Sequence, residues 1–317
     1  MDYSKKAARL TALVVGLTLA VAACGGGSSG DGSGSLAGKS FTVGSKEFTE
    51  QKVLGQVAIL ALEDAGASVK DQTGITGTTN VRKALESDQI DMYWEYTGTG
   101  FAEILGNDPT GAPTDDKELY DEVAKQDLAK NGIKWLALTS ANDTYAFATS
   151  QDSSDQYSVT TLSDYAKLVA SDPESASMCA AAEFLDRKDG WPGLSKAYGF
   201  SLPDDQITEV DLGIVFTALP KGEPCKFGEV FATDGRIPAN KLVVLDDDKN
   251  FFVKYDLAMT MKDKTLKDSP ELESILNPIA AKLTTEELQK LNARVDVDGL
   301  PEEAVAKKWL EDNNLIG

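Results

Sequence analysis

The stretch Asp91-Met92-Tyr93-Trp94-Glu95-Tyr96-Thr97-Gly98-Thr99-Gly100-Phe101 joins aromatic side chains and one carboxylate to a Thr/Gly turn. Residues 90–94 have the apolar character of a short buried strand, and a helical pattern over 79–86 precedes them. Open α/β sheets bind ligands where such strands end. Aromatic faces attract cations, whereas hydroxyl groups and free backbone amides hold anions. The stretch therefore predicts a pocket wall for a zwitterion; the alternative is an ordinary buried strand followed by a turn.

Outward from this stretch, strands and helices alternate along the chain, which predicts a doubly wound α/β fold. A chain of 317 residues is long enough for two lobes with separate cores. The expected strands are 41–43, 90–94, 133–138, 145–149, 177–182, 207–210, 227–231, 242–245 and 255–261. The expected helices are 49–66, 79–86, 114–132, 163–170, 192–198, 212–219 and three in the tail that begin near 269, 284 and 301.

Residue types at the helix ends predict where several helices begin. Thr49, Thr114 and Ser269 are expected as N-caps, because a side-chain oxygen there accepts from a free backbone N–H. Thr284 and Glu287 have the spacing of a capping box.

Residues 1–23 have the features of a signal peptide, with a basic start followed by an apolar run. The run ends in Val21-Ala22-Ala23-Cys24, which fits lipidation of Cys24. A membrane anchor is the alternative, although the run is short for a span. Residues 24–38 are rich in Gly and Ser, as in a flexible tether. We therefore expect an exported protein, lipid-anchored to the outer face of the cytoplasmic membrane.

Composition argues against several classes of function. The formal net charge of −20 makes nucleic acid an improbable partner. The chain has no histidine, which removes His-based zinc sites and imidazole bases. We also expect no metal and no cofactor. Once Cys24 is lipidated, Cys179 and Cys225 remain, and we expect a disulfide because disulfides persist in exported proteins.

Five short motifs occur in order between Phe41 and the C-terminus. They are Gly44-Ser-Lys46-Glu-Phe-Thr-Glu50-Gln, Glu95-Tyr-Thr-Gly-Thr99, Glu183-Phe184 with Arg187 and Asp189-Gly190, Phe231-Ala-Thr-Asp-Gly-Arg236, and Phe252 with Tyr255-Asp256. Together they resemble the motifs of substrate-binding proteins of glycine betaine/choline ABC importers. Any one of them alone would be a weak signal, but their order and spacing make the resemblance specific.

The resemblance implies a two-lobed, type II periplasmic-binding-protein-like fold that closes over a ligand in the cleft. Lobe 1 would comprise 39–144 plus 254–317, and lobe 2 would comprise 145–253. The implied partners are a small quaternary ammonium ligand, the transmembrane subunits of an ABC permease and the membrane, the last through the lipid anchor. A monomer is expected.

The resemblance also assigns positions to a ligand site. Aromatic rings around the quaternary ammonium group would be Tyr96, Tyr145, Tyr255 and Phe231, the last where the family usually has tyrosine. Groups that hold the carboxylate would be Lys46 and Thr99 on the first lobe and Arg187 on the second. The alternatives are core aromatics with locally satisfied hydroxyls and solvated surface charges. Trp94 and Trp191 are interpreted as packing residues.

Other functions remain open from the sequence. An enzyme would use Glu95 and Glu183 as an acid/base pair, but nothing indicates their separation, so we expect no enzyme. A structural lipoprotein, or a two-lobed receptor for an amino acid or another solute, would also explain the anchor and the fold. Within the quaternary ammonium class, glycine betaine, proline betaine, carnitine and choline are all candidates.

Overall fold

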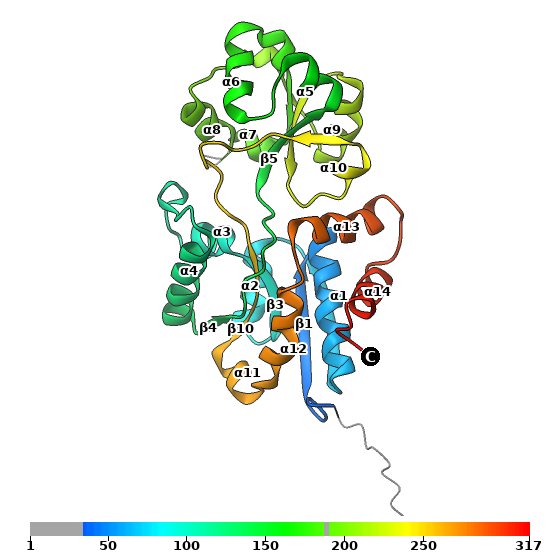
Figure 1. Cartoon of the computed structure of the whole chain (residues 1–317). Coiled ribbons are helices and arrows are strands. Elements are labelled where there is room, and N and C mark those ends of the chain that lie inside the picture. The colour runs from blue at the N-terminus through cyan, green and yellow to red at the C-terminus, as the bar shows by residue number, and fades with distance from the viewer. Residues whose placement is uncertain (1–33, 187–189) are drawn as a thin grey trace, which may run out of the picture. The chain divides into compact units, whose positions relative to one another are not determined.

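The computed structural model describes residues 34–186 and 190–317 (Figure 1). The expected signal peptide (1–23), Cys24 and Arg187 lie outside the described residues. Two five-stranded sheets, each flanked by helices, make up the described region, and this confirms the expected α/β class. Within that region, no helix has the length and apolar character needed to cross a membrane.

The first sheet contains, in spatial order, β2 (Ser68–Ile75), β1 (Ser40–Lys46), β3 (Met92–Tyr96), β10 (Leu257–Lys262) and β4 (Ile133–Trp135). β1 runs parallel to β2 and β3, whereas β10 runs antiparallel to β3 and β4. All five residues of β3 are buried, as expected for a central strand covered on both faces. Residues 92–96 of the stretch quoted at the start of the sequence analysis therefore form the central strand of this sheet.

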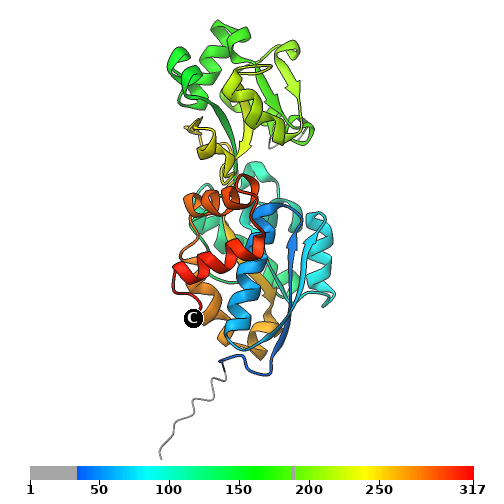
Figure 2. The same cartoon turned by 90° about the vertical axis from the view of Figure 1, so that its right-hand side faces the viewer.

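The helices around the first sheet are α1 (Thr49–Asp64), α2 (Thr78–Glu86), α4 (Asp116–Asn131), α11 (Asp263–Asp268), α12 (Glu271–Ala280), α13 (Thr285–Asp296) and α14 (Glu302–Asp312). α1 and α14, far apart in sequence, lie side by side in both views (Figures 1 and 2). Leu54 and Trp309 belong to the apolar cluster between these elements. Trp94 lies in the same cluster and donates its indole N–H to the Leu54 carbonyl at 3.1 Å, so it is a packing residue.

The second sheet contains, in spatial order, β7 (Ile207–Glu209), β6 (Met178–Ala180), β8 (Phe227–Phe231), β5 (Tyr145–Ser150) and β9 (Leu242–Val244). Its helices are α5 (Gln151–Tyr157), α6 (Leu162–Ser171), α7 (Ala182–Asp186), α8 (Trp191–Tyr198), α9 (Leu212–Ala218) and α10 (Arg236–Ala239). β5 and β8 pair antiparallel, whereas β6 runs parallel to β7 and β8. The Trp191 ring stacks on Phe147 at a centroid distance of 6.0 Å, so Trp191 is also a packing residue.

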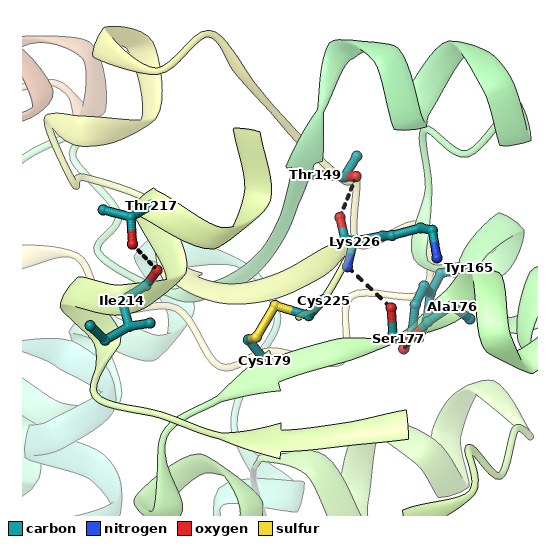
Figure 3. Close-up of a disulfide and its surroundings, with 9 residues drawn as sticks. All are labelled: Thr149, Tyr165, Ala176, Ser177, Cys179, Ile214, Thr217, Cys225 and Lys226. Carbon is teal, nitrogen blue, oxygen red and sulfur yellow. Dashed lines mark hydrogen bonds between the residues drawn. A yellow bond between two sulfur atoms is a disulfide. The ribbon is translucent and has the colours of Figure 1, made fainter. Parts of the chain in front are cut away.

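A disulfide joins Cys179 on β6 to Cys225, just before β8 (Figure 3). The two Cα atoms lie 5.6 Å apart, and both side chains are fully buried. The pairing expected from the sequence is therefore present in the structure. It ties together two adjacent strands of the second sheet.

Two segments connect the sheets, residues 136–144 and 245–256. The whole second sheet is thus inserted in the chain between β4 and β10 of the first. Because the chain returns through β10, the first sheet is completed by a strand that follows the insertion. This arrangement produces two lobes, one around each sheet.

Some expected N-cap positions are wrong by one residue. Phe48, not Thr49, holds the N-cap position of α1, and the Thr49 hydroxyl donates instead to Asp296 at 2.7 Å. Asp115, rather than Thr114, caps α4, because its carboxylate accepts from the Glu118 N–H at 2.9 Å.

The tail helices differ in similar ways. Pro270 rather than Ser269 holds the N-cap position of α12. Thr284 caps α13 by accepting from the Glu287 N–H at 3.1 Å, which confirms half of the capping box. The Glu287 carboxylate turns instead to the Trp309 indole N–H at 3.1 Å. Tertiary contacts thus compete with local capping for these side chains.

Every expected strand overlaps an observed one, although 133–138 is shortened to β4. The structure adds β2, which lies at the edge of its sheet and is half exposed, so its sequence lacks a strong apolar pattern. It also adds α5, α7, α10 and α11, each at most seven residues long. Helices this short have too few turns to show a periodic pattern.

Candidate ligand-binding site

A cavity of about 660 Å³ is lined by residues from both sheets and from the helices around them. Its lining residues are Lys46, Phe48, Thr49, Glu50, Thr78, Tyr96, Thr99, Glu103, Asp143, Tyr145, Leu212, Phe231, Thr233, Asp234, Arg236, Tyr255, Asn292 and Asp296. The structure therefore brings together Tyr96, Tyr145, Phe231, Tyr255, Lys46 and Thr99 of the expected site. Arg187, the seventh, lies outside the described residues.

The end of β3 forms one wall of this cavity. The chain turns from β3 directly into the short helix α3 (Thr97–Thr99), which continues as η1 (Gly100–Ile104). A Cβ atom at Gly98 would lie 2.8 Å from the Lys254 carbonyl oxygen and 2.9 Å from the Tyr255 ring. Only glycine fits there, and its absence of a side chain lets the Tyr255 ring approach the turn. The Thr/Gly turn thus serves close packing at the site.

Three of the expected rings form a group in the structure. Tyr145 begins β5 and pairs across the ladder with Phe231, the last residue of β8. Their ring centroids are 5.0 Å apart, and the Tyr255 ring lies 6.4 Å from Tyr145 at an interplanar angle of 81°. The strand register therefore sets the contact between Tyr145 and Phe231. The second connecting segment, residues 245–256, supplies Tyr255.

Tyr96 lines the same cavity from β3 and has a ring neighbour of its own. Phe48, which is 42% exposed, stacks on Tyr96 with a centroid distance of 6.2 Å. Phe48 stands just before α1, so the start of that helix adds a fifth ring to the cavity lining.

Lys46 is buried and forms an ion pair. Its Nζ donates to Glu95 Oε1 at 2.6 Å and lies 4.9 Å from the centroid of the Tyr96 ring. Glu95 also accepts from the Tyr93 hydroxyl at 3.0 Å and from the Tyr96 N–H at 2.8 Å. With three donors, Glu95 acts as a structural counter-ion to Lys46.

Two carboxylates, the buried Glu50 and the half-buried Asp143, lie in another region of the cavity wall. Glu50 accepts from the Tyr96 hydroxyl at 2.8 Å and from Asn292 Nδ2 at 2.9 Å. Asp143 accepts from the Thr233 hydroxyl at 2.5 Å, and the Thr233 carbonyl accepts from the same Asn292 amide at 2.9 Å. A continuous hydrogen-bonded chain therefore links Glu50 to Asp143.

Burial disfavours the charged forms of these two acids. Burial raises the pKa of Glu50 above its usual value, and the nearby charge of Asp234 adds to this effect. Burial also raises the pKa of Asp143 well above its usual value, and the Glu50 charge is the next cause. The two carboxyl groups thus oppose each other's ionisation.

Arg236 is the second cation of the cavity lining. It holds Asp234 through two side-chain hydrogen bonds, at 2.9 Å from Nε and 2.6 Å from Nη2. Its guanidinium carbon lies 4.1 Å from the centroid of the Phe216 ring. Hydrogen bonding by Asp234 raises the pKa of Arg236. This cation therefore already has both an ionic and an aromatic partner.

Several lining residues were not among the expected site residues. Phe48, Glu50, Thr233, Asp234 and Arg236 stand within the quoted motifs, so the motifs carried a signal for them. Asp143 and Asn292 lie outside every motif, and no local pattern marks them. Over residues 34–186 and 190–317, no three His, Cys, Asp or Glu side chains are grouped so as to hold a metal ion.

Comparisons with known proteins find a family model and several similar proteins. The family described as the substrate binding domain of ABC-type glycine betaine transport systems matches residues 39–312. A glycine-betaine-binding protein of Pseudomonas aeruginosa is 33% identical over 88% of this chain and 89% of its own length. The Helicobacter pylori protein named ergothioneine transport permease/ergothioneine binding protein EgtU is 31% identical over 86% of this chain and 47% of its own length. The structure of apo YehZ from Escherichia coli is similar with a TM-score of 0.75 and 30% identity, over 88% of this chain and all of that one.

Proposed function

The chain belongs to the family of substrate-binding domains of ABC-type glycine betaine transport systems, and we propose that its own ligand is a small quaternary ammonium compound held by Tyr96, Tyr145, Phe231 and Tyr255. The observation that carries this proposal is the group of rings at the cavity, with Tyr145 in contact with both Phe231 and Tyr255. A methylated ammonium group has no N–H to donate, so ring faces are its suitable partners. Each desolvated contact contributes about 2 kcal/mol.

The carboxylate of a betaine is proposed to meet Lys46, Thr99 and Arg187. Lys46 and Thr99 line the cavity, which supports their share of this assignment. Lys46 has three N–H donors and gives one to Glu95, so it retains donors for a ligand. Arg187 would supply a forked pair of donors from the second lobe.

Two lobes that share one ligand couple binding to closure. We place the lobe boundaries at 39–144 plus 254–317 and at 145–253. The two connecting segments at 136–144 and 245–256 support this division, since each passes once between the sheets. Closure would desolvate the rings and strengthen each cation–π contact.

Family members are extracytoplasmic proteins that deliver ligand to a permease. For this chain we further propose a lipid anchor at Cys24, which would keep a monomeric protein beside the transmembrane subunits at the outer face of the membrane. We propose no catalytic role, because Glu95, the candidate acid or base, already accepts hydrogen bonds from three donors.

Isothermal titration calorimetry tests the proposal. The titrants are glycine betaine, proline betaine, carnitine and choline, with unmethylated glycine and proline as matched controls. We expect saturable 1:1 binding of at least one methylated compound and none of the unmethylated controls. Binding of the amino acids in preference to the methylated compounds would support the rival receptor function and contradict ours.

A second titration tests the carboxylate site. Arg187→Ala should weaken glycine betaine binding by about 2–5 kcal/mol, because the anion loses a forked charged partner. Choline offers a hydroxyl group at that end, and the loss of one neutral hydrogen bond costs about 1 kcal/mol. Lys196→Ala, on α8 of the same lobe, is the control and should change neither affinity. Equal losses for both ligands in Arg187→Ala would show that the anion is held elsewhere.

A further inference from the structure

One region of the cavity wall is made of hydrogen-bond acceptors rather than rings. It consists of Glu50 on α1, Asp143 in the first connecting segment and Asn292 on α13, here called the acceptor cluster. Glu50 and Asn292 are 4% exposed, and Asp143 lines the cavity beside them. Thr233 connects them, since its carbonyl accepts from Asn292 and its hydroxyl donates to Asp143.

Asn292 has an acceptor atom without a partner. Its Nδ2 donates to Glu50 and to the Thr233 carbonyl, both at 2.9 Å. Both of these atoms are acceptors, so the amide orientation is fixed by its surroundings. Its Oδ1 is buried and meets no hydrogen-bond donor among the described residues. Buried acceptors are normally satisfied, so a donor from a ligand or from a water molecule would complete the bonding of this atom.

The charges around the acceptor cluster do not supply that donor. Lys46 lines the cavity from β1 and gives one hydrogen bond to Glu95 at 2.6 Å, but Asn292 Oδ1 receives none from it. Arg236 lines the cavity from α10 and is paired with Asp234 at 2.6 Å. The remaining charged lining residues, Glu103 and Asp296, are acids. The charged residues of the lining therefore do not supply a donor to Asn292 Oδ1.

A quaternary ammonium group cannot use these acceptors, because it carries methyl groups where a donor would need N–H. We propose that Glu50, Asp143 and Asn292 form a second subsite, which accepts hydrogen bonds from an N–H or O–H group of the ligand. This inference rests on the proposed function and narrows it. The preferred ligands would be quaternary ammonium compounds that also carry a hydroxyl group or a heteroaromatic N–H. Glycine betaine, which has neither, would bind less tightly than such compounds.

Pairs of ligands that differ by a single donor test the subsite. Carnitine and γ-butyrobetaine differ by one hydroxyl group, choline and its methyl ether differ by one O–H, and histidine betaine can be compared with its ring N-methyl derivative. Each is titrated into the full-length protein by calorimetry. In at least one pair we expect the donor-bearing member to bind tenfold tighter or more, since the other member leaves buried acceptors unsatisfied.

Two variants link such a preference to named residues. Asp143→Asn keeps an oxygen for the Thr233 hydroxyl but replaces the other acceptor with a donor, and Asn292→Ala removes the unpartnered oxygen. Both should reduce the preference to twofold or less. Glu286→Gln, also on α13 but outside the cavity lining, removes an exposed charge and should leave the preference unchanged. Tyr255→Ala should weaken both members of a pair by the same factor. Melting temperatures establish that each variant is folded.

The outcomes separate this inference from the proposed function. If no pair differs by more than twofold while the compounds still bind, water satisfies Asn292 Oδ1 and the subsite is wrong. If a preference exists but survives both Asp143→Asn and Asn292→Ala, the donor binds elsewhere and the subsite is again wrong. If none of the compounds binds, the proposed function itself fails.

Discussion

The ammonium group of Lys46 lies 2.6 Å from a carboxylate oxygen of Glu95, and both side chains are almost fully buried. Glu95 belongs to β3 and Lys46 ends β1, so the pair spans two adjacent strands of the first sheet. A buried ion pair is stable only while both partners remain, because either charge alone would be left in a medium of low polarity. Lys46 therefore lines the cavity, and its ion pair with Glu95 also stabilises the fold.

Removing one partner of this pair tests its structural role. Glu95→Gln should lower the free energy of unfolding by about 3–5 kcal/mol, because Lys46 keeps its charge without a counter-ion. Urea denaturation measures this loss. The exposed pair Lys117–Asp121 is the control, and Asp121→Asn should cost less than about 1 kcal/mol. A loss in Glu95→Gln as small as in the control would mean that solvent reaches Lys46.

The aromatic rings of Tyr145 and Tyr255, more than their hydroxyl groups, should contribute to ligand binding. Tyr255→Ala and Tyr145→Ala should each weaken the binding of a quaternary ammonium ligand by about 1–3 kcal/mol, through lost cation–π contact. The matching Phe variants keep the ring and should lose less. Calorimetric titration of the four variants measures this, and unchanged affinity in both Ala variants would place the cation outside this cavity.

Stability should depend on pH through Asp256. Burial, together with the nearby charge of Asp116, raises the pKa of the Asp256 carboxyl to about 7, and its Oδ2 is buried with no partner among the described residues. In the unfolded chain the pKa is about 3.9. The folded state therefore binds this proton more tightly. The resulting stabilisation is complete below about pH 4 and is lost as the pH rises through about 7.

The variant Asp256→Asn isolates this effect, because it carries no titratable group at that position. The melting temperature of the variant minus that of wild type should be larger at about pH 8 than at about pH 5. At about pH 8 only the wild type must bury a charged carboxylate at this position. Thermal denaturation of both proteins at the two pH values measures the difference. An offset between them that does not change with pH would show that Asp256 titrates as an ordinary exposed carboxyl.

The disulfide should contribute to stability through its loop. Cys179 and Cys225 are 46 positions apart, and in the chain-entropy model closing a loop of this length stabilises by roughly 4 kcal/mol. Reductant should therefore lower the melting temperature. The double variant Cys179→Ser/Cys225→Ser is the control and should not respond to reductant. Detection of two free thiols in the unreduced protein by mass spectrometry would contradict the prediction.

Local sequence determined the central elements of the first sheet. β3 and its Thr/Gly turn are marked by a run of apolar residues followed by glycine, and both signals depend on neighbours in the chain. Tyr96 and Tyr255 stand in two of the quoted motifs and Tyr145 begins an expected strand, and the resemblance to a known family identified all three as site candidates. The cysteine pair followed from the exported character of the chain and a count of cysteines.

Only the tertiary structure assembled the acceptor cluster at the cavity. Asn292 meets Glu50 across 242 positions of sequence, and Thr233 meets Asp143 across 90. No periodic pattern records contacts of this kind, because they arise when helices and loops from different sheets pack together. The same holds for the helix starts, where Thr49 donates to Asp296 instead of capping its helix. Side chains with several possible partners take the one that packing brings within reach, and the sequence alone does not specify which one that is.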